Sequence, residues 1–232
     1  MKECSDPTAA FFIQKLLQAY HKQNQTFDSR LPIDRTMLHQ LTASLSHTIS
    51  GKYRHALFQA MFSLAFHAFL WIGEITVQTV AYANPYLLML HQIQIQPQHL
   101  TVHFTSSKHS NWHDVPLQVE PSTPSEHCPV RIMRQYLCLR GSQPGPLFQY
   151  SPQSPITKTD FTEEFKKALH FCRIAPSGIK SHSFRIGAAT TAAAMGFSDS
   201  HIHQLCRWKS DAFKRYIRFL MRTSHLSEIA GQ

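Results

Sequence analysis

The order of the predicted elements constrains the fold of this 232-residue chain more than any other feature of its sequence. Three segments, at 87–95, 99–107 and 112–120, alternate apolar and polar residues and contain β-branched side chains. This pattern predicts three strands, and we expect them to form one small antiparallel sheet. Because segments with helical spacing stand on both sides of these strands, the expected fold class is a mainly helical α+β domain.

Helical periodicity accounts for most of the remaining chain. Asp34 is expected to be the N-cap of a helix that ends near residue 46, and the apolar residues of 52–70 predict a long helix at the centre of the core. Gly73 and Glu74 begin a shorter helix that we expect to end near residue 81. Further helices are predicted at 7–23, 128–140, 159–173, 181–195, 198–206 and 210–220, and a loop rich in Pro, Gly and Ser is predicted at 141–155.

The net charge of +9 is unevenly distributed along the chain. Residues 1–127 hold 8 Lys and Arg against 8 Asp and Glu, whereas residues 128–232 hold 15 against 6. The whole excess lies in the C-terminal half, where a basic face attracts phosphate backbones and releases their counterions. This distribution favours nucleic acid as a partner, and a basic surface that is merely solvated is the alternative.

Cysteine and histidine usage argues against a disulfide framework and against a metal site. The five cysteines are odd in number, and none forms a Cys-x-x-Cys pair. His201 and His203 are spaced as a metal pair would be, but no clustered Cys or carboxylate accompanies them. No apolar run is long enough to span a membrane, and the first ten residues do not resemble a signal peptide. We therefore expect a reducing compartment, the cytosol or the nucleus, and no cofactor; of the two compartments, the nucleus is our prediction.

One C-terminal stretch combines four side chains suited to binding and attacking a phosphate. It reads SHSFRIGAATTAAAMGFSDSHIHQLCRWKSDAFKRYIRF and contains His182, Arg185, Trp208 and Tyr216. His182 and Arg185 are three residues apart and so share one face of a helix. Taken singly, each of these residues is more often structural, but together they closely resemble the active-site region of tyrosine recombinases, the enzymes of DNA strand exchange. The stretch is most similar to recombinases of DIRS-type retrotransposons.

This resemblance also suggests how the chain is divided. It extends over roughly residues 28–222 and identifies 28–232 as a tyrosine recombinase catalytic domain. Residues 1–27 are interpreted as a remnant helix and linker of the core-binding domain that precedes the catalytic domain in the family. Because recombinases enclose DNA between these two domains, we expect a shortened first domain to reduce the affinity for DNA.

The resemblance implies DNA strand breakage and rejoining through a 3′-phosphotyrosine, without a metal or nucleotide. Tyr216 corresponds to the nucleophile. Arg185 corresponds to one of two arginines that clamp the phosphate, a task suited to a planar and permanently charged guanidinium. His182 and Trp208 correspond to side chains that hydrogen-bond the phosphate or, in the case of His182, help to take the proton of the tyrosine.

Two more site residues are implied by the resemblance outside this stretch. Lys108, at the end of the second predicted strand, corresponds to the general acid that protonates the leaving oxygen. Glu74 corresponds to an acidic residue that supports the first of the two clamp arginines.

Position 71 departs from the family pattern. Where the family has Arg-Ile-Gly-Glu, this chain has Trp71-Ile-Gly-Glu74. An indole offers one neutral hydrogen-bond donor and no charge. The loss of one donor that stabilises the charge of the transition state typically reduces the rate by about 10²–10³. We therefore expect strand cleavage to be impaired and Trp71→Arg to raise it. Cys206 is a milder departure, because the family often has Gly there, and a Cβ is expected to crowd a tight turn. A buried structural thiol is the alternative role of Cys206.

Two functions therefore stay open. The first is a tyrosine recombinase of mobile-element origin with weakened cleavage, and the second is a catalytically inactive DNA-binding remnant or domesticated module; a helical protein-interaction domain without a DNA role is a third interpretation. For the first two, the partner is double-stranded DNA, with self-assembly on it as a further possibility, and neither a membrane nor a small-molecule substrate is involved. Candidate phosphate contacts outside the active site are Lys180, Arg207, Lys209, Lys214 and Arg215.

Overall fold

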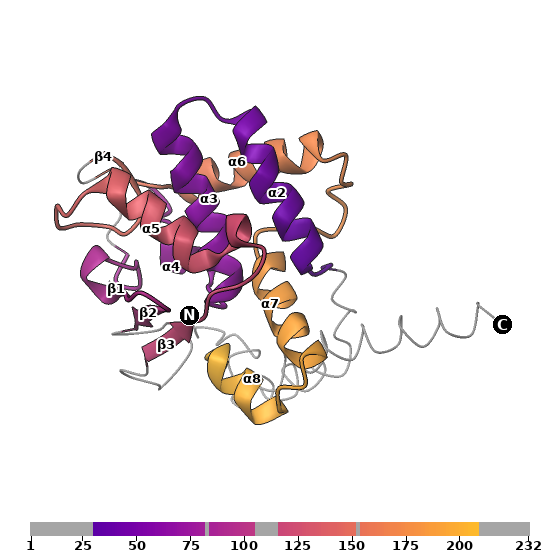
Figure 1. The fold of residues 1–232 in the computed structure, drawn as a ribbon. Helices are drawn as coiled ribbons and strands as arrows, with labels where there is room; N and C mark the ends of the chain where they lie inside the picture. The colour runs from indigo at the N-terminus through magenta and orange to yellow at the C-terminus, as the bar shows by residue number, and fades with distance from the viewer. Residues whose placement is uncertain (1–29, 82–83, 105–115, 152–153, 209–232) are drawn as a thin grey trace, which may run out of the picture.

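The computed structural model describes residues 30–81, 84–104, 116–151 and 154–208 (Figure 1). The α-helices of this part of the chain are α2 (Arg35–Thr48), α3 (Lys52–His67), α4 (Ile72–Ile75), α5 (Pro129–Arg140), α6 (Lys158–Phe171), α7 (Ser183–Ala194) and α8 (Asp199–Leu205). The strands are β1 (Ile93–Ile95), β2 (Leu100–His103), β3 (Pro116–Val119), β4 (Gln149–Ser151) and β5 (Ser154–Pro155). Because β1, β2 and β3 form one antiparallel sheet in that order, the predicted mainly helical α+β class is confirmed.

α2 begins where the sequence predicts, because Asp34 caps it. The Asp34 carboxylate accepts a hydrogen bond from Met37 N at 2.7 Å, which satisfies one of the free N–H groups of the first turn. Leu38, Leu41 and Leu45 lie three and four residues apart and are buried on one face of the helix. α2 packs against α3 and α6.

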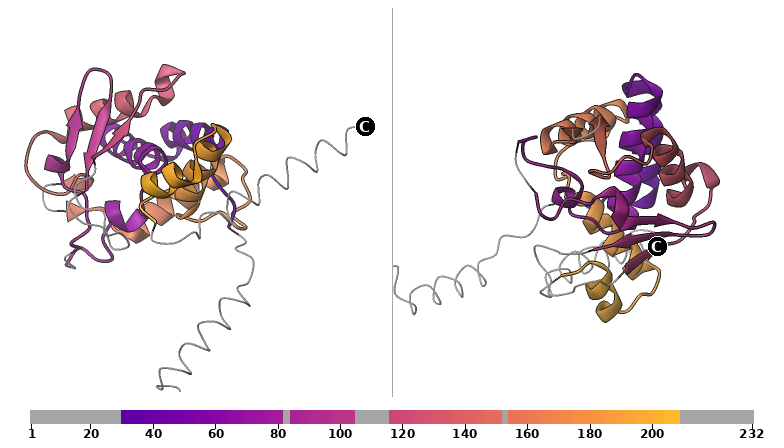
Figure 2. Two further views of the ribbon diagram at one scale, coloured as in Figure 1. Left: turned by 90° about the horizontal axis from the view of Figure 1, so that it is seen from below. Right: turned by 90° about the vertical axis from the view of Figure 1, so that its left-hand side faces the viewer.

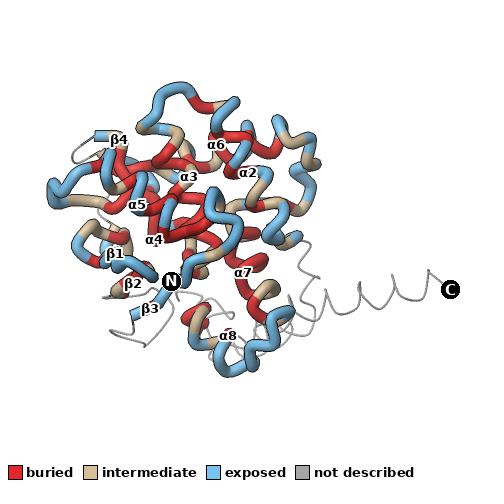
Figure 3. Tube along the Cα trace, in the orientation of Figure 1, coloured by how far each residue is buried: buried red, intermediate tan, exposed pale blue. Residues whose placement is uncertain are grey.

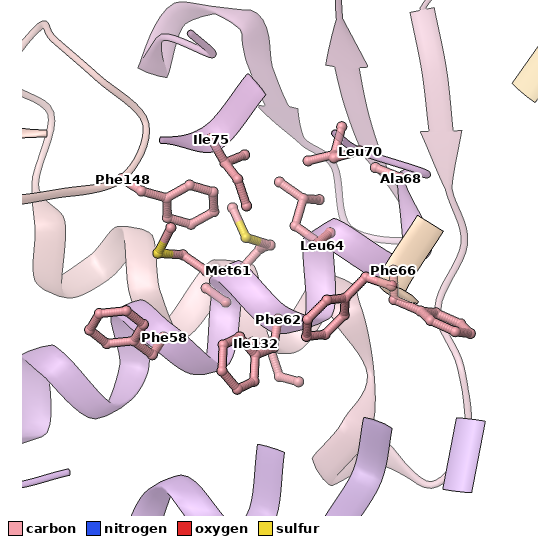
Figure 4. Close-up of a cluster of buried hydrophobic side chains, with 14 of the residues drawn as sticks. Phe58, Met61, Phe62, Leu64, Phe66, Ala68, Leu70, Ile75, Ile132 and Phe148 are labelled. Carbon is pink, nitrogen blue, oxygen red and sulfur yellow. The ribbon is translucent and has the colours of Figure 1, made fainter. Parts of the chain in front are cut away.

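α3 is the central helix of the core. Nearly all residues between Ala56 and Phe66 are buried, as expected of a helix that is apolar around its whole circumference (Figure 3). The centroid of the Phe62 ring lies 5.3 Å from that of Phe161 and 5.8 Å from that of Phe165, both on α6, and 5.3 Å from that of Phe184 on α7. Figure 4 shows the cluster of buried apolar side chains around this helix.

The sheet and α8 lie at one end of the domain, away from α2 and α6 (Figures 1 and 2). α7 runs toward α8 and packs against both α3 and α8. α7 therefore connects the helical core to the end of the domain that carries the sheet.

The three strands form within the segments where the sequence places them, and residues 105–107 and 112–115 of the expected strands lie outside the described residues. Val102, at the centre of the sheet, faces Ile93 on β1 and Leu117 on β3. Leu100 and Val119 pair in the next inward-facing position, and both are buried. This alternation of buried and more exposed residues along β2 and β3 is the period-two pattern of the sequence.

The first part of the expected strand at 87–95 is not a strand. The chain forms a 3-10 turn at Leu90–Gln92, and β1 begins only after it. The Gln92 side chain explains the difference, because its Oε1 accepts a hydrogen bond from Met89 N at 2.8 Å and its Nε2 donates to His103 O at 2.9 Å. A buried amide thus satisfies backbone groups that a longer strand would have paired.

The expectation that the helix at Gly73 continues to residue 81 is wrong, because the helix is shorter. α4 ends at Ile75, and Val77 pairs instead with the chain that precedes α6. Val77 N donates to Ile156 O at 3.0 Å, and Lys158 N donates to Val77 O at 2.8 Å. Backbone partners that are distant in sequence therefore replace the continuation of the helix.

The expected loop at 141–155 contains a short hairpin, β4 and β5. Arg140, the last residue of α5, is buried beneath this segment. Its guanidinium donates hydrogen bonds to the carbonyl groups of Gly141, Gln143, Pro146 and Leu147. One buried cation thus organises a segment whose composition predicts only a loop.

Two predicted helices, at 7–23 and 210–220, lie outside the described residues, and the proposed boundary near residue 27 lies there too. Among the helices that the structure describes, none combines the length and the apolar character needed to cross a membrane.

α7 approaches the chain before α2 so closely that only glycine fits at position 187. Ile33 N donates to Ser183 O at 3.1 Å, and Ile33 is fully buried. A Cβ on Gly187 would lie 1.8 Å from Ile33 O and 2.7 Å from its carbonyl carbon. Because these are backbone atoms, a larger residue at 187 must push α7 away from this segment.

We expect Gly187→Ala to lower the free energy of unfolding by about 3 kcal/mol or more, because overpacking against the backbone is strongly destabilising. Urea unfolding measures the loss. Gly73→Ala is the matched control, since no atom lies within 4 Å of its added Cβ, and the change there should stay below about 1 kcal/mol. A Gly187→Ala protein as stable as its parent would contradict the close approach.

Candidate functional site

Three separate segments bring the candidate site residues together. His182 is the N-cap residue of α7, and Arg185 lies in the first turn of that helix. Trp71 is the N-cap residue of α4, and Trp208 follows the end of α8. The site thus lies where the start of α7 meets the α3–α4 turn and the chain after α8.

Arg185 is enclosed at the centre of this cluster. Its side chain is 0% exposed, and its guanidinium donates hydrogen bonds to the carbonyl oxygens of Phe69 and Cys206. Its Cζ lies 4.4 Å from the ring centre of Trp71 and 5.0 Å from that of Trp208. Two cation–π contacts and two charge-assisted hydrogen bonds therefore stabilise a charge that has no exposed surface.

Two left-handed residues shape the walls around Arg185. Phe69 has a φ of 51° in the turn after α3, and Arg207 has a φ of 50° after α8. Residues other than glycine rarely adopt this conformation, which typically costs about 1–3 kcal/mol. The hydrogen bonds from Arg185 to Phe69 and to Cys206, the neighbour of Arg207, help to offset this cost.

Arg207 and Glu74 form a buried ion pair beside Arg185. Nη2 of Arg207 lies 2.9 Å from Oε2 and 3.1 Å from Oε1 of Glu74, and the two side chains are only 8% and 6% exposed. The Arg207 guanidinium also packs on Phe104, with Cζ 3.7 Å from the ring centre. Trp71 N donates to Oε2 of Glu74 at 2.8 Å. Both carboxylate oxygens of Glu74 are therefore engaged.

This ion pair places two residues differently from the sequence-based expectations. Arg207 is expected at the DNA surface, but the structure buries it against Glu74. Glu74 is expected to support an arginine at position 71, but it holds Arg207 instead. The sequence contains one signal for such a pair, because a carboxylate within the apolar run LWIGEI needs a cationic partner if it is buried.

Trp71 covers the two residues that the resemblance assigns to the phosphate. Its ring stacks on that of His182, with centres 4.7 Å apart and 30° between the planes, and it also packs on the guanidinium of Arg185. Compared with the arginine of the family pattern, the indole at position 71 removes one positive charge from the site. It also covers a second positive charge, that of Arg185.

A cavity of about 790 Å³ opens beside Trp71 and His182. Three cationic side chains border it: Arg30, Lys158 and Lys180. Lys158 and Lys180 are exposed, and only Lys180 belongs to the sequence-based candidates. A concave surface with several cations suits a polyanion such as a DNA backbone.

Glu74 is the only acidic residue among the described residues that line this cavity, and Arg207 neutralises it. The electrostatic character of the cavity is therefore set by its lysines and its arginine. Single-sequence reasoning misses Arg30 and Lys158 because a surface cation gives no local sign of what it faces.

Cys206 is a buried thiol that packs with Ile202 and Trp208. Burial raises its pKa to about 12, although the nearby positive charges of Arg185 and Arg207 act in the opposite direction. Its φ of −77° is right-handed, so the expectation that a Cβ at 206 crowds the turn is wrong. The strained residue of that turn is Arg207.

Several candidate residues lie outside the described part of the chain, so their roles stay predictions. They are Lys108, Lys209, Lys214, Arg215 and Tyr216. In the ranges that the structure covers, no group of three or more His, Cys, Asp or Glu side chains is placed to hold a metal ion.

The fold resembles those of several solved recombinases and integrases. For the XerH site-specific recombinase bound to palindromic difH, the TM-score is 0.65 at 11% identity, over 90% of this chain and 55% of XerH. For the XerA recombinase it is 0.59 at 16% identity, over 95% of this chain and 76% of XerA. The Tn1549 transposon integrase in complex with transposon right end DNA gives 0.54 at 10% identity, over 87% and 66% of the two chains.

The chain has the fold of a tyrosine recombinase catalytic domain. It spans about half of the length of XerH, and identities this low establish the fold alone. The sequence matches no family model and no curated protein.

Arg185 should resist modification by an arginine-directed reagent such as phenylglyoxal while the protein is folded. Trp71→Ala removes one wall of its enclosure, so we expect the modification rate of Arg185 to rise severalfold. Peptide mass spectrometry after timed labelling measures this rate. Arg140 is an internal control for global unfolding, because it is buried and bonded to four carbonyl groups in another part of the fold. Labelling of Arg185 in the parent as fast as that of exposed Arg131 would contradict the enclosure.

Proposed function

We propose that this chain is a DNA-binding protein of the tyrosine recombinase type whose strand breakage and rejoining is strongly attenuated. The proposal rests on one observation above all, the enclosure of the Arg185 guanidinium between Trp71 and Trp208. Its partner is duplex DNA, its origin a mobile element of the DIRS type, and its site of action the nucleus. Self-assembly on the DNA belongs to the same proposal.

The proposed chemistry begins with Tyr216. Its hydroxyl gives up its proton, which His182 helps to take, and attacks a DNA phosphodiester, so that a 3′-phosphotyrosyl bond forms as the bond to the 5′-oxygen breaks. The 5′-oxygen leaves with a proton from Lys108. A 5′-hydroxyl then attacks the phosphotyrosyl bond and restores the DNA backbone. Arg185, His182 and Trp208 donate hydrogen bonds to the phosphate oxygens, where negative charge increases in the transition state. Each bond broken is replaced by one formed, so no nucleotide is consumed.

The geometry around Arg185 opposes this chemistry. To reach a phosphate, its guanidinium must leave the carbonyl groups of Phe69 and Cys206 and two aromatic faces. A hydrogen bond to a charged group contributes about 1.5–3 kcal/mol, and a partly buried cation–π contact contributes about 1–2 kcal/mol. These contacts compete with the phosphate for the same cation, so the cleavage rate falls by at least the factor that one lost donor would cause, about 10²–10³.

Binding of DNA depends on other residues. Arg30, Lys158 and Lys180 border the cavity next to Trp71, and Lys209, Lys214 and Arg215 add charge in the sequence that follows Trp208. The contacts of Arg185 with Phe69, Cys206, Trp71 and Trp208 do not involve the exposed Lys158 and Lys180. DNA binding can therefore persist when cleavage does not, which is the basis of the alternative function, a catalytically inactive DNA-binding module.

A covalent-trapping assay tests the catalytic half of the proposal. The protein is mixed with nicked duplexes whose cleavage product diffuses away, and a denaturing gel detects a DNA adduct. We expect an adduct that is weak and that disappears in Tyr216→Phe. A strong adduct that matches an active recombinase would contradict the attenuation, and an adduct unaffected by Tyr216→Phe would contradict the assigned nucleophile.

Salt dependence tests the DNA-binding half. The affinity of the parent for duplex DNA should fall steeply as the salt concentration rises. The double variant Lys158→Glu/Lys180→Glu should bind more weakly, and the slope of log K against log salt concentration should decrease in magnitude by about 2. Lys166→Glu is the matched control, because Lys166 is exposed on the same helix as Lys158 but does not line the cavity. Binding without salt dependence would leave a protein-interaction domain as the better interpretation.

A further inference from the structure

Both carboxylate oxygens of Glu74 already accept hydrogen bonds in a buried environment. The Glu74 side chain is 6% exposed, and both of its oxygens accept from Nη2 of Arg207 while Oε2 also accepts from Trp71 N. A second cation that approached Glu74 would have to displace Arg207 or share the same two oxygens. The pair is also enclosed, because Arg207 packs on Phe104 on its other side.

Position 71 lies where a third positive charge would be costly. The Trp71 side chain packs directly on the guanidinium of Arg185, and its backbone N–H binds Glu74. Arg207 and Arg185 both donate to the carbonyl oxygen of Phe69, so the two guanidinium groups already meet at one acceptor. An arginine at 71 would add a third guanidinium beside Arg185 and Arg207, next to which Glu74 is the one carboxylate among the described contacts, and like charges this close repel each other.

We propose that Arg207 is a positioning residue that holds Glu74 in place of an arginine at position 71. A neutral residue at 71 and a cation at 207 are therefore matched, and each is tolerated because of the other. Trp71→Arg alone should not restore the clamp, in contrast to the expectation from the sequence, because Glu74 is already occupied. The clamp requires Trp71→Arg together with the removal of Arg207, a consequence that rests on the proposed recombinase function.

Glycine is the best replacement for Arg207 in this test. Arg207 has a φ of 50°, in the left-handed region that glycine adopts without steric cost, so Arg207→Gly removes the side chain while it favours the existing turn. What the substitution loses is the ion pair with Glu74, the contact with Phe104 and the long hydrogen bonds to the carbonyl groups of Phe69 and Leu205. The change in stability of Arg207→Gly is therefore the loss of those contacts, offset in part by the left-handed backbone cost that glycine removes.

A double-mutant cycle tests the match between positions 71 and 207. Thermal unfolding is measured for the parent, Trp71→Arg, Arg207→Gly and the double variant. We expect Trp71→Arg to lower Tm in the parent, and Arg207→Gly to lower it by about 10 °C, because it leaves a buried carboxylate without its cation. In the Arg207→Gly background, Trp71→Arg should instead raise Tm, because the new arginine binds Glu74.

A change of sign between the two backgrounds supports the proposal. A second cycle with Arg207→Gln, which removes the charge but keeps hydrogen-bond donors near Glu74, should give the same sign. Trp71→Arg combined with Arg54→Ala is the matched control, since the Arg54–Glu164 pair is exposed on the arginine side and lies in a different ion pair. Trp71→Arg that lowers Tm in every background, or double variants that do not fold, would overturn the proposal.

The covalent-trapping assay separates this inference from the proposed function. The double variant should yield a Tyr216-dependent adduct about 10²-fold above the parent, whereas Trp71→Arg alone should yield no gain. If the stability cycle changes sign but no variant forms an adduct, residues 71 and 207 are matched through Glu74 and the proposed strand cleavage is wrong. If Trp71→Arg alone raises the adduct as much as the double variant does, the role of Arg207 is wrong and the recombinase function stands.

Discussion

The buried guanidinium of Arg185 is the constraint on which the rest of the site depends. A charge with no exposed surface is stable only if its donors are bonded and its faces are covered. The carbonyl groups of Phe69 and Cys206 meet the first condition, and the indoles of Trp71 and Trp208 meet the second. Because these residues belong to the α3–α4 turn and to the chain after α8, one side chain of α7 ties both segments together.

A second buried charge pair allows this arrangement. With a neutral indole at position 71, Glu74 would be a buried carboxylate without a cation, and the desolvation of such a group is strongly unfavourable. Arg207 supplies the cation from the turn after α8, and its left-handed backbone brings its side chain back toward Glu74 and Phe104. The two arginines are not independent, because both donate to Phe69 O.

The contacts that stabilise the site are the ones that make it unavailable to a phosphate. Each hydrogen bond and aromatic contact of Arg185 must be exchanged before that cation can stabilise a transition state, so stability and catalysis oppose each other here. The cavity cations Lys158 and Lys180 are exposed and lie outside these contacts. A protein of this kind can lose strand cleavage while it keeps the electrostatic attraction to DNA, which is set by net charge and not by the geometry of one site.

The sequence by itself determined the α+β class, the cap at Asp34, the three-stranded sheet and the grouping of His182 with Arg185 on one helix, because periodicity and capping act within a few residues. Only the tertiary structure decided that α4 stops at Ile75, since its competitor is the distant chain before α6. Only the tertiary structure decided that Arg207 binds Glu74, 133 residues away, and not a solvent-exposed partner. Which cation meets a buried carboxylate depends on how the helices pack, and no local pattern in a single sequence carries that information.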